Sequence, residues 1–278
     1  SMRPLSLTTV PLDLLSVDGE KCGAATGFFH SSDANSMFLV TNWHVVTGRD
    51  PRNPTVTAHH YRVPVSLRLK LHARTERSGA VNLNKTLELK IPINDERGES
   101  PQWIEHPKYH HTVDVVVIKI PKHILSTAHL KTVDECDLDT TYREMAMDSI
   151  FVLGYPAGLH GGNQVLPIYK SGNIASEPAV DQQGLPRFLI DCRTYKGMSG
   201  SPVVCSHSGI HSPSGVLDVD TVIGTVLKFV GVYSGRLYGI DGDENSEPFT
   251  SEIGQVWKSS VIDEIIVSNS AALAYSEL

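Results

Sequence analysis

The stretch YKGMSGSPVV at residues 195–204 places Ser199 among small residues, directly before an apolar segment that reads as a strand. Glycines beside a serine let a loop turn sharply and let a substrate backbone approach, so that backbone N–H groups converge on one point. A nucleophile in acyl transfer needs this local arrangement. Because Gly and Ser are also ordinary loop residues, the stretch alone does not separate a catalytic loop from a plain turn.

Two other residues supply what a serine hydroxyl needs, namely a base that takes its proton and a carboxylate that orients the base. His44 lies in LVTNWHVV at the end of an apolar strand, and Asp114 in HTVDVVVIKI opens another. Each also has a plain structural reading, as a surface histidine and as a strand start. The order histidine, aspartate, serine excludes the α/β-hydrolase order, in which the histidine follows the nucleophile, and is that of the chymotrypsin arrangement.

Short strands separated by turns account for most of the chain. Residues 61–73 alternate apolar and polar side chains with period two, which is typical of a half-buried antiparallel strand. Further strands are predicted at 27–29, 37–46, 87–93 and 113–120, and in the second half at 149–156, 165–176, 187–193, 201–206 and 221–234. A helical stripe occurs only at 254–267. The pattern predicts an all-β fold, with two six-stranded antiparallel β-barrels and a C-terminal helix.

A polar, acidic stretch separates the two sets of strands and suggests a connecting segment. The predicted organisation is an N-terminal extension at 1–21, a first barrel at 22–122, a linker at 123–147, a second barrel at 148–253 and a C-terminal helix and tail at 254–278.

Composition narrows the function classes. The formal net charge of -7 argues against binding to nucleic acid or to an anionic membrane surface. A local basic patch is still compatible with this net charge. No apolar run approaches the roughly 18 residues of a membrane-spanning helix. Pro4, Pro11 and Asp13 interrupt any apolar centre of an export signal. We therefore expect a cytoplasmic protein with four free thiols (Cys22, Cys136, Cys192, Cys205), the alternative being a secreted protein with paired cysteines.

Cofactor motifs are missing from the sequence. It contains no phosphate-binding GxxxxGK loop, no GxGxxG after a strand and no HExxH, so neither a cofactor nor a metal is expected. Cys205, His207 and His211 lie close together, but a fourth ligand is missing and the surrounding composition is that of a loop.

Taken together, the motifs resemble those of trypsin/chymotrypsin-type serine proteases of the bacterial kind, in the style of the Deg-like and glutamyl-endopeptidase-like branches. TNWHVV at 41–46, DVVVIKI at 114–120 and GMSGSP at 197–202 match the histidine, aspartate and serine motifs of that family. VGVYSG at 230–235 resembles the strand that pairs with substrate beside the specificity pocket. The resemblance spans about residues 22 to 267.

The resemblance implies a serine endopeptidase that acts through an acyl-enzyme. Ser199 would be the nucleophile, His44 the general base and Asp114 the group that fixes the imidazole tautomer, with the backbone N–H groups of Gly197 and Ser199 forming the oxyanion hole. The implied partner is a protein or peptide substrate. The implied substrate-binding residues are Arg193, Thr194, Ser234, Gly235 and Arg236.

Specificity and control depend on two departures from the digestive members of the family. The trypsin-like Asp at the pocket floor is absent, so preference for Lys or Arg is not expected; Arg193 either favours an acidic or polar side chain or pairs with Asp191. Met198 stands where those members carry an Asp that pairs with a newly released N-terminus. We therefore expect activity without N-terminal processing, and control by loop ordering or a regulatory protein partner.

A rival hypothesis is a catalytically silent or latent member of the family that acts as a partner-binding module. The intact His44, Asp114 and Ser199 weigh against it, because a silent copy has no chemical reason to keep all three.

Overall fold

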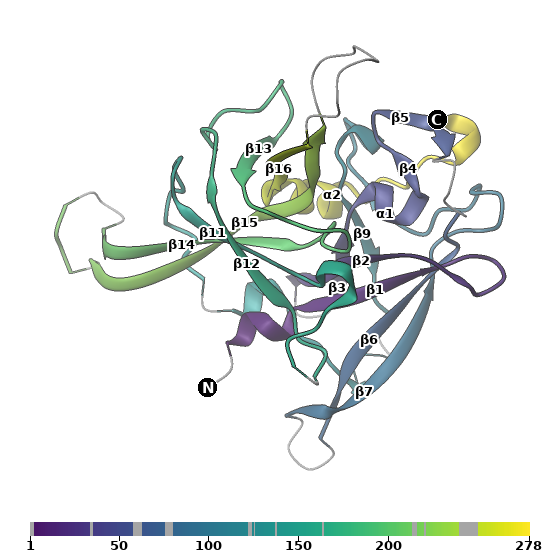
Figure 1. Cartoon of the computed structure of the whole chain (residues 1–278), viewed down its shortest axis with the longest axis horizontal. Helices are drawn as coiled ribbons and strands as arrows, with labels where there is room; N and C mark the ends of the chain where they lie inside the picture. The colour runs from purple at the N-terminus through teal and green to yellow at the C-terminus, as the bar shows by residue number, and fades with distance from the viewer. Residues whose placement is uncertain are drawn as a thin grey trace.

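Strands dominate the computed structural model and form two large sheets and one small hairpin (Figure 1). The structure describes residues 3–33, 36–57, 63–75, 80–121, 124, 126–136, 138–162, 164–212, 216–219, 221–238 and 250–278. The predicted all-β class is confirmed.

The first sheet has eight strands in the described part of the chain. Its order is β10-β6-β1-β2-β3-β9-β8, with β7 paired to β6. The strands are β1 (Thr9–Leu15), β2 (Lys21–Asp33), β3 (Ser36–Thr41), β6 (Ser66–Arg74), β7 (Val81–Pro92), β8 (Ile104–Glu105), β9 (Val116–Lys119) and β10 (Ala128–His129). The expected number of six is thus too low here, because two-residue strands carry no periodic pattern.

Residues 1–21 are not a detached extension, because they contain β1. This strand pairs with β2 on one side and with β6 on the other. Pro11 pairs with Thr26 of β2 but lies outside the β6 register, so its missing N–H breaks no bond to β6. Residues 123–147 likewise contribute β10, which pairs with β6, and are more than a linker.

The second half is a closed barrel of six antiparallel strands, as predicted. In order around the barrel these are β11 (Ser149–Gly154), β12 (Ile168–Ile174), β13 (Arg187–Asp191), β16 (Thr250–Lys258), β15 (Val222–Tyr238) and β14 (Pro202–His211). Each strand predicted from the sequence of this half has a counterpart in the structure.

The C-terminal helix is shorter than predicted. Residues 254–258 continue β16, which pairs with both β13 and β15 and so closes the barrel, and helix α2 runs over Ser260–Ser268. A short apolar run such as Val256–Trp257 fits a strand and a helix equally well, so the start of the helix could not be predicted from periodicity alone. No helix in the described ranges is long and apolar enough to cross a membrane.

Short elements complete the fold. They are α1 (Trp43–Thr47), the hairpin strands β4 (Arg49–Asp50) and β5 (Asn53–Thr57), and the 3-10 turns η1 (Pro4–Leu7), η2 (His110–Thr112), η4 (Val133–Glu135), η5 (Pro156–Gly158) and η6 (Tyr275–Glu277). The four cysteines are free thiols in the structure.

One apolar cluster joins the two halves. It contains Phe28 and Val40 from the first sheet, Trp257 from the barrel and Ile262 from α2, all at most 2 % exposed. The ring of Phe28 meets the ring of Phe229 of β15 edge to face, with the ring centroids 5.4 Å apart. The two sheets are therefore one packing unit, and their relative placement depends on buried aromatic contacts.

We predict that Phe28→Ala lowers the free energy of unfolding by about 3–5 kcal/mol, because it leaves a cavity between the halves. Urea unfolding measures the change. Phe28→Leu is the matched control and should lose much less. A loss below about 1 kcal/mol in Phe28→Ala would contradict this role.

Candidate active site

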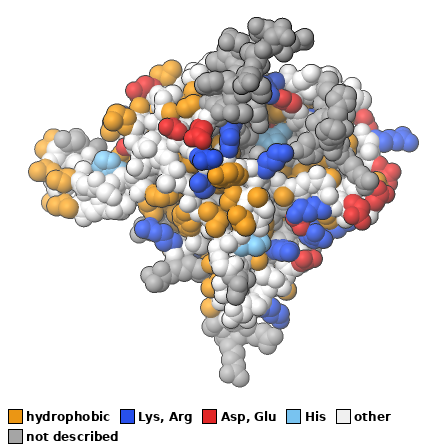
Figure 2. All heavy atoms as spheres, in the orientation of Figure 1, with side chains coloured by type: hydrophobic (Ala, Val, Ile, Leu, Met, Phe, Trp, Pro, Cys, Tyr) orange, Lys and Arg blue, Asp and Glu red, His pale blue; other side chains and the backbone are white. Residues whose placement is uncertain are grey.

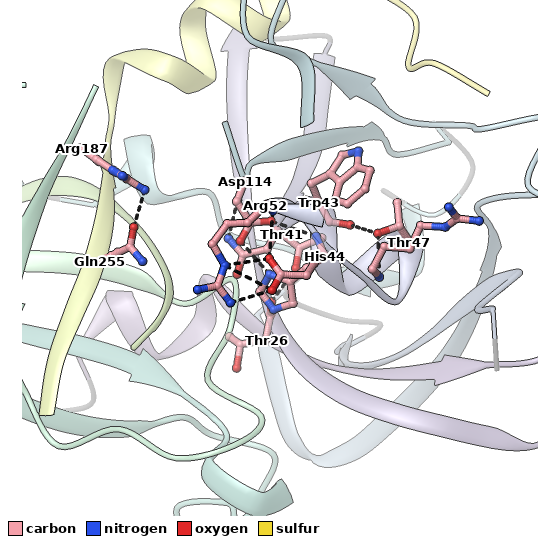
Figure 3. Close-up of polar contacts among 12 residues, drawn as sticks. Thr26, Thr41, Trp43, His44, Thr47, Arg52, Asp114, Arg187 and Gln255 are labelled. Carbon is pink, nitrogen blue, oxygen red and sulfur yellow. Dashed lines mark hydrogen bonds and ion pairs between the residues drawn. The ribbon is translucent and has the colours of Figure 1, made fainter. Parts of the chain in front are cut away.

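His44 and Asp114 meet because their strands are neighbours. β3 pairs with β9 in a register that sets Thr41 opposite Val116, so the residues after β3 and those before β9 lie at one end of the sheet. His44 donates to the Asp114 carboxylate twice, from its backbone N–H to Oδ1 at 2.8 Å and from ring Nδ1 to Oδ2 at 2.7 Å (Figure 3). Because a carboxylate only accepts, Nδ1 carries the proton and Nε2 is left as the basic atom.

A third contact fixes the backbone of the aspartate. The side-chain amide of Asn42 donates to the carbonyl oxygen of Asp114 at 2.7 Å, and both residues are buried. Asp114 is thus held through its backbone by Asn42 and through its carboxylate by His44, so the imidazole cannot rotate freely.

Negative charge sets the proton affinity of His44. Burial of the ring opposes protonation, but the carboxylate of Asp114, helped by that of Asp50, outweighs it and raises the pKa of His44 above its ordinary value of 6.5. Asp50 is ionised there because Arg52 hydrogen-bonds to it, with Nη2 2.6 Å from Oδ2, and lowers its pKa. His44 therefore carries a proton more readily than a free imidazole.

The loop that carries Ser199 is fixed from both sides. On one side, Thr26 of β2 donates its N–H to the Ser199 carbonyl at 2.9 Å and its Oγ1 to the Gly197 carbonyl at 2.8 Å. On the other side, the N–H of Gly200 donates to the Tyr233 carbonyl of β15 at 2.9 Å. Ser199 is thus flanked by one strand from each half of the molecule.

The close approach of the serine loop to the first sheet requires a glycine. Gly200 has φ +85, and a Cβ there would lie 2.2 Å from the Thr26 carbonyl oxygen and 2.4 Å from Thr41 Oγ1. Thr41 ends β3, three residues before His44. The loop therefore contacts the strand that delivers the histidine.

His44 and Ser199 are not hydrogen-bonded to each other in the structure. Both residues are described, and no hydrogen bond joins His44 Nε2 to Ser199 Oγ. His44 and Asp114 are brought together, and the serine loop is placed against the strand that leads to them.

Two backbone donors of the serine loop have no acceptor among the described residues, namely the N–H groups of Gly197 and Ser199. The preceding carbonyl, that of Lys196, accepts from the N–H of Ala157 at 2.7 Å. Because the C=O and N–H of a trans peptide point in opposite directions, this bond turns the Gly197 N–H away from Ala157. The pair is available to bind a negatively charged oxygen.

Of the five predicted substrate-binding residues, the structure joins Thr194 and Arg236 directly. The Arg236 guanidinium donates to the Thr194 carbonyl, and the Thr194 hydroxyl is hydrogen-bonded to that of Tyr233, both residues being buried. Ser234 and Gly235 lie between Tyr233 and Arg236 on β15. The segment before Ser199 and this part of β15 are therefore side by side.

Arg193 is not part of this group. Its side chain is 66 % exposed, and its Nε lies 3.6 Å from Glu252 rather than near Asp191. The alternation of the chain explains the difference, since Cys192 and Thr194 are buried and Arg193, which lies between them, faces outward.

Sequence reasoning missed Thr26, Thr41 and Asp50. The first two bond to, or pack against, residues more than 150 positions away, which no local pattern signals. Cys205 and His207 lie on β14, and no group of three His, Cys, Asp or Glu residues in the described ranges is placed to hold a metal.

We predict that Thr26→Val destabilises the protein by about 2 kcal/mol or more, because it leaves the Gly197 carbonyl and the Tyr155 N–H, both now bonded to Thr26 Oγ1, without a buried partner. Thr26→Ser keeps the hydroxyl and should lose much less. Urea unfolding of both variants measures the difference, and equal stability of the two would contradict the assigned role.

We predict that Asp50→Asn lowers the pKa of His44 by about half a unit or more, because it removes a negative charge and leaves the Arg52 cation unneutralised. NMR titration of the His44 imidazole measures the shift. Asp181→Asn, in the exposed pair with Lys258, is the control and should leave His44 unchanged. A pKa that stays constant or rises in Asp50→Asn would refute the prediction.

The fold is similar to that of a solved protease structure. The active form of the Rv3671c protease from M. tuberculosis shares 16% identity at a TM-score of 0.50, covering 97% of this chain and 85% of that chain. Its inactive form shares 17% identity at a TM-score of 0.45, with 96% and 90% covered. The likeness to the active form shows a shared fold alone. No curated protein matches the chain. The model of the trypsin-like peptidase domain matches residues 25–209, more than half of the chain and including His44, Asp114 and Ser199, so the protein belongs to that family.

Proposed function

We propose that the protein is a serine endopeptidase that cleaves peptide bonds through Ser199, His44 and Asp114. The observation that carries the proposal is the two-point hold of Asp114 on His44, because it fixes the tautomer that leaves Nε2 unprotonated. A general base needs such an atom, and the serine loop lies against the strand that positions it.

The reaction follows from these positions. His44 Nε2 takes the proton of Ser199 Oγ as Oγ bonds to the substrate carbonyl carbon, and the oxygen that becomes negative is bound by the N–H groups of Gly197 and Ser199. Each such donor contributes roughly 3 kcal/mol to the transition state. The C–N bond then breaks as the imidazolium protonates the leaving amine. Water, activated by the same base, hydrolyses the acyl-enzyme.

Activity in this proposal needs no N-terminal cleavage. Met198 is fully buried in the apolar cluster of the second barrel, so it offers no carboxylate to a newly formed N-terminus. The bond from Ala157 to the Lys196 carbonyl orients the 196–197 peptide in the uncleaved chain. An enzyme that is inert until it is cut near residue 20, in the turn between β1 and β2, would contradict this part.

Residue preference follows from charge. The Arg236 guanidinium, beside the buried Thr194 and Tyr233, disfavours a cationic side chain before the scissile bond. Strong cleavage after Lys or Arg would contradict this assignment.

The second candidate function is a latent family member that binds a partner. The observation that favours it is that no hydrogen bond joins His44 Nε2 to Ser199 Oγ, because proton transfer requires these two atoms to come within hydrogen-bond distance. A bound partner or substrate would then have to close that contact.

We predict that the uncleaved protein hydrolyses peptides from a mixed pool and that Ser199→Ala and His44→Ala each lower kcat by a factor of about a thousand or more. Mass spectrometry of newly formed N-termini measures cleavage. Ser208→Ala, at an exposed hydroxyl of β14, is the control and should cleave normally. No cleavage by folded wild-type protein would favour the latent form, and equal cleavage by Ser199→Ala would refute the catalytic assignment.

A further inference from the structure

A cavity of about 100 Å³ lies where the first sheet meets the loop that follows β11. β1, β2 and β6 form one wall, and the loop forms the other. Its polar lining consists of Asp13, Lys21, Arg68, Lys70, Tyr155 and His160. Figure 2 shows Lys and Arg side chains beside a His side chain on this part of the face, where Figure 1 draws β1, β6 and the loop after β11.

Positive charge dominates the lining, with three cations against one carboxylate. Asp13 accepts from Lys21 and from Arg68, whose Nη2 lies 2.8 Å from Oδ2. Lys70 has no carboxylate within ion-pair distance in the described part of the chain; Glu88 stands opposite it in the β6–β7 register but does not line the cavity. The cations therefore exceed what Asp13 neutralises, and they share a concave site that favours an anionic group.

The loop wall of the cavity is adjacent to the oxyanion donors. Gly158 lines the cavity, and its neighbour Ala157 donates to the Lys196 carbonyl. On the opposite wall, Ala25 lines the cavity, and its neighbour Thr26 donates to the Ser199 carbonyl. The cavity lining thus lies within one residue of two of the contacts that hold the serine loop.

The two flanks of the serine loop give a direction to the substrate. β15 lies on one flank, through Tyr233, and β2 lies on the other, through Thr26. In the proposed function the acyl side of the peptide runs along Ser234–Arg236, the expected substrate-binding segment of β15. On that assignment the peptide crosses Ser199 and its other side passes β2 and the loop after β11, so the cavity is on the side of the leaving amine.

We propose that this cavity binds an acidic side chain, Asp or Glu, within the first three residues after the scissile bond of the substrate. The inference rests on the proposed peptidase function and adds a substrate class to it. A free anion such as inorganic phosphate is also negatively charged, so the test distinguishes the two sources.

The first experiment compares matched peptides that carry Glu or Gln at each of the three positions after the scissile bond. Wild-type kcat/KM should favour Glu at one position by about fivefold, the equivalent of about 1 kcal/mol, as expected for a partly exposed ion pair. Lys70→Gln should reduce the preference to about twofold or less, and Lys70→Glu should reverse it toward Lys. Lys119→Gln is the control, on β9 of the same sheet, and should keep the full preference.

The second experiment separates this inference from the proposed function. Fluorescently labelled forms of the same peptides are bound to Ser199→Ala, where no turnover is needed, and the Glu peptide should bind about fivefold more tightly unless Lys70 is replaced. Equal affinity for Glu and Gln peptides at all three positions overturns the inference, even for an active enzyme. If the protein binds the Glu peptide selectively but cleaves no peptide, the result supports the acidic-side-chain site and contradicts the proposed peptidase function.

The phosphate arm is run at constant ionic strength. Inorganic phosphate should compete with the Glu peptide and leave binding of the Gln peptide unchanged. If phosphate instead raises cleavage of the Gln peptide, and does so only when Lys70 is present, the cavity serves a free anion and the inference is wrong.

Discussion

Thr26 joins parts of the molecule that are remote in sequence. Its N–H and Oγ1 donate to the carbonyls of Ser199 and Gly197, its own carbonyl accepts from Thr41 Oγ1, and its Oγ1 accepts from the N–H of Tyr155. The residue is fully buried, so each of these groups would be costly to leave unpaired. Because the strand of Thr26 belongs to the first sheet and the serine loop to the second barrel, these hydrogen bonds tie the loop to the first sheet, beside the apolar contacts that join the halves.

The geometry of the site follows from these hydrogen bonds. Thr41, which bonds to Thr26, ends the strand that leads into His44, and Gly200 packs against both threonines without room for a Cβ. The serine loop and the histidine are thereby brought to one edge of the first sheet. The charges are arranged around the same junction, with Asp114 and Asp50 raising the proton affinity of His44, and Lys70 and its neighbouring cations lining the wall beyond Thr26.

Local sequence patterns were sufficient where the structure is locally determined. Five of the six strands of the second barrel were predicted from apolar runs between turns, and the pairing of His44 with Asp114 from motif order; the structure contains these strands and this pairing. The alternation of buried and exposed residues along 187–193 also accounts for the outward position of Arg193, since its neighbours Cys192 and Thr194 face inward. The prediction of a helix over residues 254–258 was wrong because a strand that closes a barrel is recognised by its pairing partners, and these lie elsewhere in the chain.

The contacts of Thr26 and the charged cavity could not be predicted from the sequence, because they too depend on residues that are far apart in the chain. Thr26 and Gly197 are 171 positions apart, and the cavity near Ser199 takes its charges from three strands and a loop. Long-range hydrogen bonds of this kind leave no spacing, period or composition in the sequence. The strand β1 was also missed, because Pro11 reads as a strand breaker unless its position outside the β6 register is known.

In the proposed function His44 activates Ser199 as a nucleophile, and labelling with a fluorophosphonate tests this activation without a substrate. The native protein is treated with the probe, digested, and the modified residue is mapped by mass spectrometry. If His44 activates Ser199, we expect one adduct, on Ser199, that disappears in His44→Ala and in unfolded protein. An adduct on another residue, or equal labelling of Ser199 with and without His44, would contradict it.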